Sequence, residues 1–137
     1  MGVFNVNKER VIYIDLKKDE QVLSHLKYKD RFLSPSLLQW ESQTGTRMNN
    51  SKGISLLKNP YSYIFVRKAK REDGAEMPFY YLGRGCLKNP RMSDNPKETL
   101  LFDIELEEKV PLMYYDDFGI ERNEEENPGR VCLNQEE

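Results

Sequence analysis

The residues best suited to recognition chemistry lie in the stretch LLQWESQTGTR, residues 37–47. It contains the only tryptophan of the chain, Trp40, followed by an amide, three hydroxyl groups and a guanidinium group. An indole offers a large apolar surface, whereas the polar groups donate and accept hydrogen bonds. This combination is typical of a site that holds a planar polar ligand. An alternative with equal weight is that Trp40 simply pins an element onto the core.

Groups that carry out catalysis are scarce in this sequence. Acyl-transfer triads and most zinc sites need a histidine with a precisely placed partner, and the chain has a single histidine, His25, in a polar segment. Cys86 and Cys132 are too few and too far apart for a zinc site or a disulfide framework. Gly83-Arg84-Gly85 is too short for a phosphate-binding loop. We therefore expect no enzyme activity, no metal and no cofactor.

The distribution of charge limits the kinds of partner. Residues 121–137 hold six acidic and two basic residues, which leaves 19 basic and 17 acidic residues in the first 120. This body is too weakly basic for a generic DNA binder, so any contacts with nucleic acid must be local and selective. We expect one domain over residues 1–120 and a flexible acidic tail over 121–137. The N-terminus lacks a secretion signal, no apolar run is long enough for a membrane span, and a reducing cytoplasm is expected.

Several segments have the patterns of strands, and one has the pattern of a helix. Residues 11–16, 61–69, 78–87 and 100–106 are rich in β-branched and aromatic residues or alternate with a period of two. Ser34 and Pro35 favour a helix start, which predicts a helix over residues 35–43 with Leu37 and Trp40 on one face. Residues 47–52 are expected to form an exposed loop. The fold class is α+β, with five or six strands in a small curled β-barrel and a short helix across it.

Motifs spaced along residues 11–111 resemble one known family. They are Tyr28 with Asp30, Ser34-Pro35, Trp40-Glu41-Ser42-Gln43, Phe65-Val66-Arg67, Pro78-Phe79 and Leu82-Gly83. In this order they are similar to the domain of unknown function at the C-terminus of bacterial DEAD/DEAH-type helicases, a domain that often lies in one chain with a phospholipase-D-type nuclease domain.

The resemblance implies a fold and a function. The fold would be PUA-like and similar to SRA domains. The function would be target recognition in ATP-dependent type IV restriction enzymes, which act on modified DNA. The implied ligand is 5-methylcytosine or 5-hydroxymethylcytosine in duplex DNA, and the implied partners are the helicase and nuclease domains of the same parent protein, in the bacterial cytoplasm.

Under this resemblance the polar residues near Trp40 acquire roles. A reader of a methyl group in duplex DNA must take the base out of the stack, at a cost of a few kcal/mol. Trp40 would form a platform or wall, Gln43 on the same helix face would reach the base edge, and Asp30 would accept from the cytosine amino group. The stacking partners would be Tyr28, Phe79 and Tyr80. The groups that grip phosphates or fill the gap in the duplex would be Ser42, Thr44, Thr46, Arg47 and Asn50, and Arg67 would pair with a carboxylate or a phosphate.

Two other functions remain open at this point. A protein-interaction or regulatory module that docks on a helicase predicts an exposed apolar patch in place of a polar-lined aromatic pocket. An RNA-binding domain is the second alternative, because PUA-like folds also bind RNA.

Overall fold

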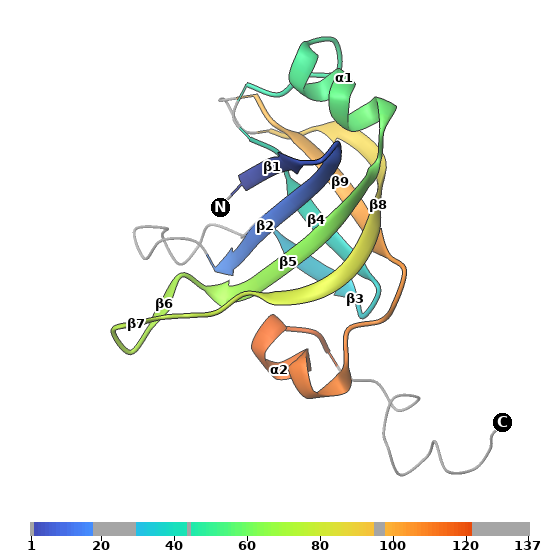
Figure 1. Ribbon diagram of the computed structural model, residues 1–137. Helices are drawn as coiled ribbons and strands as arrows, with labels where there is room; N and C mark the ends of the chain where they lie inside the picture. Colours follow the sequence, from blue (N-terminus) through green and yellow to red (C-terminus); the bar gives the residue numbers. More distant parts are fainter. Residues whose placement is uncertain (1, 18–29, 44, 95–97, 122–137) are drawn as a thin grey trace, which may run out of the picture.

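A computed structural model describes residues 2–17, 30–43, 45–94 and 98–121 (Figure 1). Tyr28, Thr44 and the expected acidic tail beyond residue 121 lie outside these ranges. The strands are β1 (Gly2–Val6), β2 (Glu9–Lys17), β3 (Arg31–Ser34), β4 (Leu37–Glu41), β5 (Tyr61–Ala69), β6 (Arg71–Glu72), β7 (Ala75–Glu76), β8 (Tyr80–Met92) and β9 (Leu100–Leu106). The helices are α1 (Ser51–Lys58), the 3-10 helix η1 (Leu112–Tyr114) and α2 (Tyr115–Phe118).

One sheet dominates the described part of the chain. Its seven strands have the order β1-β2-β5-β8-β9-β4-β3, and a separate hairpin joins β6 to β7. Strands β2 and β5 are parallel, whereas the other neighbours are antiparallel. The sheet curls so that β2, β5 and β8 lie in front of β9, β4 and β3 (Figure 1). The expected α+β class is consistent with this mostly β structure, but β1 and β3 remain as edges and the sheet does not close into the expected barrel.

The core lies inside the curl and follows the alternation of the strands. Ile12 of β2 pairs with Ile64 of β5, and Ile104 of β9 pairs with both Leu87 and Leu38. Ile12, Ile64, Ile104 and Leu38 are fully buried. Because side chains alternate between the two faces of a strand, these apolar rows meet on the inner face. The strands expected over 61–69 and 100–106 are confirmed with the same bounds.

The prediction of a helix over residues 35–43 is wrong. Residues 37–41 form strand β4, and Ser34 and Pro35 lie at the tight turn that joins it to β3. Leu38 and Trp40, two positions apart, are the buried pair, so the period is two. Pairing with β9 along the whole of β4 provides backbone hydrogen bonds and buries this face, which overrides the local helix-start signal.

The exposed loop expected over residues 47–52 holds for residues 47–50, which are mostly exposed, and helix α1 begins at Ser51, where the sequence predicted no helix. Asn50 caps α1: its side-chain oxygen accepts from the backbone N–H of Gly53 at 3.0 Å. Gly53 lies so close to residue 47 that a Cβ would come within 1.6 Å of the Arg47 carbonyl oxygen. Leu56 is the side chain of α1 that enters the core. α1 and α2 lie at opposite ends of the curled sheet (Figure 1).

Candidate functional site

A small pocket lies at the α1 end of the sheet, between β1, the segment after β4, and α1. Its volume is about 180 Å³, and it is not closed. The residues that line it are Val3, Asn5, Arg10, Trp40, Ser42, Gln43, Thr46, Lys52, Ser55 and Leu56. Four residues singled out from the sequence (Trp40, Ser42, Gln43 and Thr46) therefore meet at one cavity.

Trp40 forms part of the pocket wall and also belongs to the core. Its side chain is 4% exposed, and its ring stacks on Phe102 with centroids 5.9 Å apart and 28° between the planes. Because one face of the indole is occupied by Phe102, the ring is placed as a wall and not as an open platform. It is also the only aromatic side chain among the described residues that line the pocket.

Ser42 and Thr46 are buried residues of the pocket that carry hydroxyl groups, and only the Ser42 hydroxyl group is hydrogen-bonded to the described part of the chain. Ser42 Oγ accepts from the Leu100 backbone N–H at 2.8 Å, and the Ser42 N–H donates to the Leu100 carbonyl at 2.8 Å. These bonds hold the end of β4 against β9. The Thr46 side chain is 2% exposed and makes no hydrogen bond to the part of the chain that the structure describes. Its hydroxyl group therefore has no partner among these residues, at a position that lines the pocket.

Gln43 provides the most accessible amide of the pocket. The residue is exposed, and its side chain makes no hydrogen bond within the described ranges. Its Nε2 lies close to Gly2, where a Cβ would approach it to 3.3 Å. An amide in this position has both a donor and an acceptor to offer a ligand. Because Gln43 lies two residues beyond β4, it is not on one helix face with Trp40 as expected.

Arg10 places a positive charge at the inner end of the pocket. It is 5% exposed, and its Nη1 donates to the Asn59 carbonyl at 2.5 Å and to Ser62 Oγ at 3.1 Å. Its Nη2 donates to the Ser55 carbonyl at 2.8 Å. These carbonyls lie at the C-terminal end of α1, where the helix dipole is negative. Burial lowers the pKa of Arg10 from its ordinary value, but a guanidinium group stays charged in proteins.

The charges that line the pocket are all positive. Arg10 and Lys52 contribute cations, and no carboxylate is among the described lining residues. Arg10 forms no ion pair with any acidic residue in the described ranges. A buried charge that is balanced only by neutral dipoles favours an anionic ligand nearby.

Asn50 and Arg47 shape the pocket from outside it. Asn50 Oδ1 accepts from the Arg47 backbone N–H at 3.1 Å, and Asn50 Nδ2 donates to the Gly45 carbonyl at 2.7 Å. The Arg47 side chain turns away to Glu98, with Nε 2.6 Å from the carboxylate. Neither side chain lines the pocket, so their direct role in gripping phosphates stays a prediction.

The other residues selected from the sequence lie apart from this pocket. Asp30 is buried and accepts from the Glu41 backbone N–H at 2.8 Å. Arg67 is 2% exposed, pairs with Asp15 at 2.5 Å and lies 4.2 Å over the Phe79 ring on the outer face of the sheet. Tyr80 packs against Tyr114 and Phe118 at the α2 end.

Arg10 and Lys52 were missed by sequence reasoning, although Arg10 leaves a signal. It precedes Ile12, Ile14 and Leu16 at intervals of two, which places a charge in the row of residues that faces the core. Such a position requires neutral acceptors or a ligand, because a buried charge is costly without them. Lys52 gives no such signal, because it follows from the position of a helix that the sequence did not predict.

Comparison with known proteins identifies the family. Residues 1–118 match the model of the family described as Domain of unknown function (DUF3427), and the chain belongs to this family. No curated protein and no solved structure matches the chain. Within the described ranges, no helix is long and apolar enough to cross a membrane, and no three His, Cys, Asp or Glu side chains are grouped as a metal site.

Proposed function

We propose that this protein is a DNA target-recognition domain that takes an extruded, modified cytosine into the pocket beside Trp40. The modification would be a 5-methyl or 5-hydroxymethyl group on cytosine in duplex DNA. The observation that carries the proposal is the convergence of Trp40, Ser42, Gln43 and Thr46 on one open cavity. The curled sheet supports an SRA-like, PUA-like architecture for this reader.

The size of the pocket suits one six-membered ring. Its volume is about 180 Å³, whereas an engineered apolar cavity of about 150 Å³ accommodates benzene. A pocket of this size holds a pyrimidine and leaves little room for a second ring. The Trp40 wall would provide the apolar contact for a methyl group, and Tyr28 remains the predicted stacking partner.

The polar groups suit the edge of a base and its phosphates. The side chains of Gln43 and Thr46 make no hydrogen bond to residues that the structure describes. The Watson–Crick edge of an extruded base requires such donors and acceptors. Lys52, which is exposed, supplies positive charge where a flanking phosphate would enter, and Arg10 adds a buried positive charge at the inner end of the pocket. This local charge agrees with a body whose overall charge is too small for nonspecific binding.

In the parent protein the domain would select the target for helicase and nuclease domains of a modification-dependent restriction enzyme in the bacterial cytoplasm. This assignment comes from the resemblance to helicase-associated domains, because the family that the chain belongs to is described as a domain of unknown function. The residues of the pocket would recognise the modified base, and the other domains would cleave the DNA and move along it.

A binding titration tests the proposal. Duplexes of one sequence that carry cytosine, 5-methylcytosine or 5-hydroxymethylcytosine are titrated by fluorescence anisotropy at several salt concentrations, with single-stranded RNA of the same sequence as a fourth ligand. Burial of one methyl group is worth about 0.8 kcal/mol, so we expect about fourfold tighter binding of the methylated duplex. Equal affinities for modified and unmodified duplexes would remove the claim, and preferred binding of the RNA would assign the pocket to RNA.

A second candidate function is a protein-interaction module. The outer face of β1, β5 and β8 carries exposed apolar side chains, with Phe4 49%, Val6 55%, Tyr61 48% and Tyr81 56% exposed. Exposed apolar side chains that share one face of a sheet suit a contact surface. This face and the Trp40 pocket are separate, so the two functions are compatible.

A further inference from the structure

A bulge in β8 shapes the outer face of the sheet. Tyr81 pairs with Phe65, and Arg84 pairs with Tyr63, so the pairing gains one residue on β8 between these positions. The extra residue lets Tyr81 and Arg84, three positions apart, lie on the same face. Gly83 within the bulge has φ of +87°, which favours glycine, and a Cβ there would meet no heavy atom within 4 Å. The bulge therefore leaves open space beside Tyr81.

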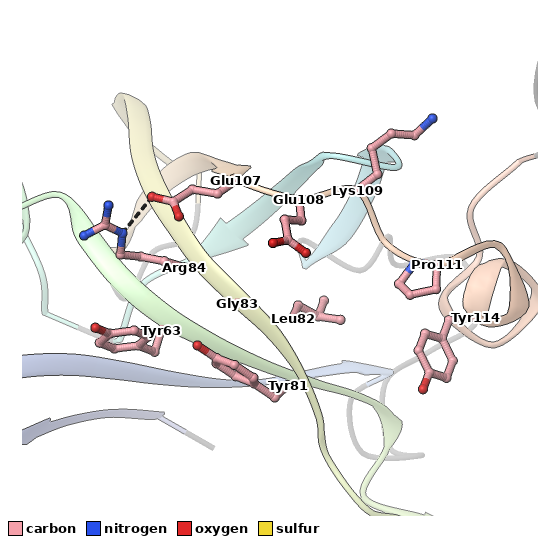
Figure 2. A pocket seen from close by; sticks show the side chains of 10 residues that line it. All are labelled: Tyr63, Tyr81, Leu82, Gly83, Arg84, Glu107, Glu108, Lys109, Pro111 and Tyr114. Carbon is pink, nitrogen blue, oxygen red and sulfur yellow. Dashed lines mark hydrogen bonds and ion pairs between the residues drawn. The ribbon is translucent and has the colours of Figure 1, made fainter. Parts of the chain in front are cut away.

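This space is a groove of about 600 Å³. Figure 2 shows the side chains that line it, and none of them lines the Trp40 pocket. Tyr63 and Tyr81 line it from the sheet, and Tyr114 lines it from η1. Leu82, which is 7% exposed, lies between Tyr81 and Tyr114 in Figure 2. The volume is within the range of about 300–1,000 Å³ that is usual for ligand pockets. It is large enough for a long side chain and the backbone next to it.

Two acidic and two basic residues line this groove, and Glu108 is the charged residue that points toward it without an ion pair in the described ranges. Arg84 and Glu107 neutralise each other through an ion pair of 2.7 Å, and the hydrogen bond and charge of Glu107 raise the pKa of Arg84. Glu108 points toward the groove, whereas the ammonium group of Lys109 points away from it (Figure 2). Glu108 has no hydrogen bond or ion pair with any residue that the structure describes. Its carboxylate and the negative faces of the tyrosine rings favour a cation.

The same face already holds two guanidinium groups on aromatic rings. Arg84 lies 4.8 Å from the centroid of the Tyr61 ring, and Arg67 lies 4.2 Å from that of Phe79. A planar guanidinium group both stacks on a ring and donates two parallel hydrogen bonds to a carboxylate, which an ammonium group does not do. The groove offers both features to an incoming side chain.

We propose that this groove binds an arginine side chain that a partner protein presents on an extended segment. The guanidinium group would lie against Tyr81 and Tyr114 and donate to Glu108, and the flanking backbone would follow the bulge at Gly83. Nucleic acid is disfavoured here because the Glu108 carboxylate, which points toward the groove, repels phosphate groups. The proposal is independent of the pocket at Trp40.

The test uses the full chain labelled with ¹⁵N and a peptide, acetyl-Gly-Arg-Gly-amide, followed by NMR. Chemical-shift changes are expected at Tyr81, Gly83 and Glu108. The matched peptide with citrulline, which keeps the shape without the charge, should bind about fivefold more weakly. Equal binding of the two peptides, shift changes confined to another face, or no shift change at millimolar peptide would overturn the proposal.

Variants distinguish the contribution of the Tyr81 ring to peptide binding from that of the Glu108 carboxylate. Glu108→Gln and Tyr81→Leu should each weaken the arginine peptide about fivefold, whereas Tyr81→Phe should retain its affinity. Glu9→Gln, which removes another exposed carboxylate, should have no effect. Full affinity in Glu108→Gln contradicts the assignment of the carboxylate. Shift changes at the groove upon titration with duplex DNA, in place of peptide, would assign the groove to nucleic acid and overturn the protein partner.

Discussion

Arg10 of β2 and Ser62 of β5 face each other across two parallel strands, with Nη1 of Arg10 3.1 Å from Oγ of Ser62. The pair stands where the apolar row of Ile12 and Ile14 would otherwise continue. It marks the change from a dry core to a polar pocket, because Arg10 lines that pocket while Ile12 and Ile14 do not.

The positive charge of the pocket should control the salt dependence of DNA binding. Lys52→Met removes one exposed cation, so the slope of log K against log salt should fall by about one. Arg10→Met should have a similar effect on binding and, because it leaves the Ser55 and Asn59 carbonyls without their donor, should also lower the free energy of unfolding by about 1–3 kcal/mol. Arg84→Met, on the outer face, is the control. An unchanged slope in Lys52→Met would argue against a phosphate at this pocket.

Gln43 should control selectivity without affecting stability. Because Gln43 is exposed, Gln43→Ala should change the free energy of unfolding by no more than about 0.5 kcal/mol. The affinity ratio between methylated and unmethylated duplexes should approach one if the amide helps to hold the base in the pocket. Asn49→Ala, in the same region but outside the pocket, should leave the ratio unchanged. A preserved ratio in Gln43→Ala assigns base recognition to another residue.

Gly53 should be required for the position of α1. A Cβ at residue 53 would lie 1.6 Å from the Arg47 carbonyl oxygen and 2.6 Å from its carbon, so α1 would have to move. We expect Gly53→Ala to lower the free energy of unfolding, measured by urea denaturation, by about 3 kcal/mol and to weaken DNA binding. Ser51→Ala, at an exposed position of the same helix, should have a small effect. A fully stable Gly53→Ala variant would show that α1 is not packed as described.

The pair of Arg67 and Asp15 should stabilise the fold without a role in the pocket. Arg67 is 2% exposed, so Asp15→Asn leaves a buried charge without its main partner and should lower the free energy of unfolding by about 3 kcal/mol. Glu76→Gln removes a more distant and exposed carboxylate and should cost less than about 0.5 kcal/mol. DNA affinity, measured where Asp15→Asn is folded, should remain unchanged. A loss of affinity there would place Arg67 in the interface, as the sequence suggested.

Strand patterns predicted the sheet better than local signals predicted the helices. The alternation in residues 100–106 and the β-branched and aromatic run in 61–69 are both typical of strands, and both strands have the expected bounds. Ser34-Pro35 fits a turn as well as a helix start, and only the pairing of β4 with β9 decides between them. The helix α1 has only eight residues and contains Gly53, so its stability depends on the Asn50 cap and on the burial of Leu56, which the sequence pattern does not reveal.

The candidate site was predicted in part for the same reason. Ser42, Gln43 and Thr46 line the pocket because they follow the end of β4 at Glu41, next to Trp40. Arg67, Phe79 and Tyr80 did not, because the alternation of side chains sends Arg67 to the outer face and the length of β8 carries Tyr80 to the α2 end. The position of Arg10 depends on the parallel pairing of β2 with β5, which connects residues about 50 positions apart.

The emission of Trp40 gives the most direct measurement of the central claim, because the chain has no other tryptophan. The full chain is titrated with duplexes that differ only in one 5-methyl group, and tryptophan fluorescence and anisotropy are recorded together. A base that enters the pocket should change the emission in a saturable way, at lower concentrations for the methylated duplex. Binding of both duplexes with equal affinity and no change at Trp40 would contradict base recognition in this pocket.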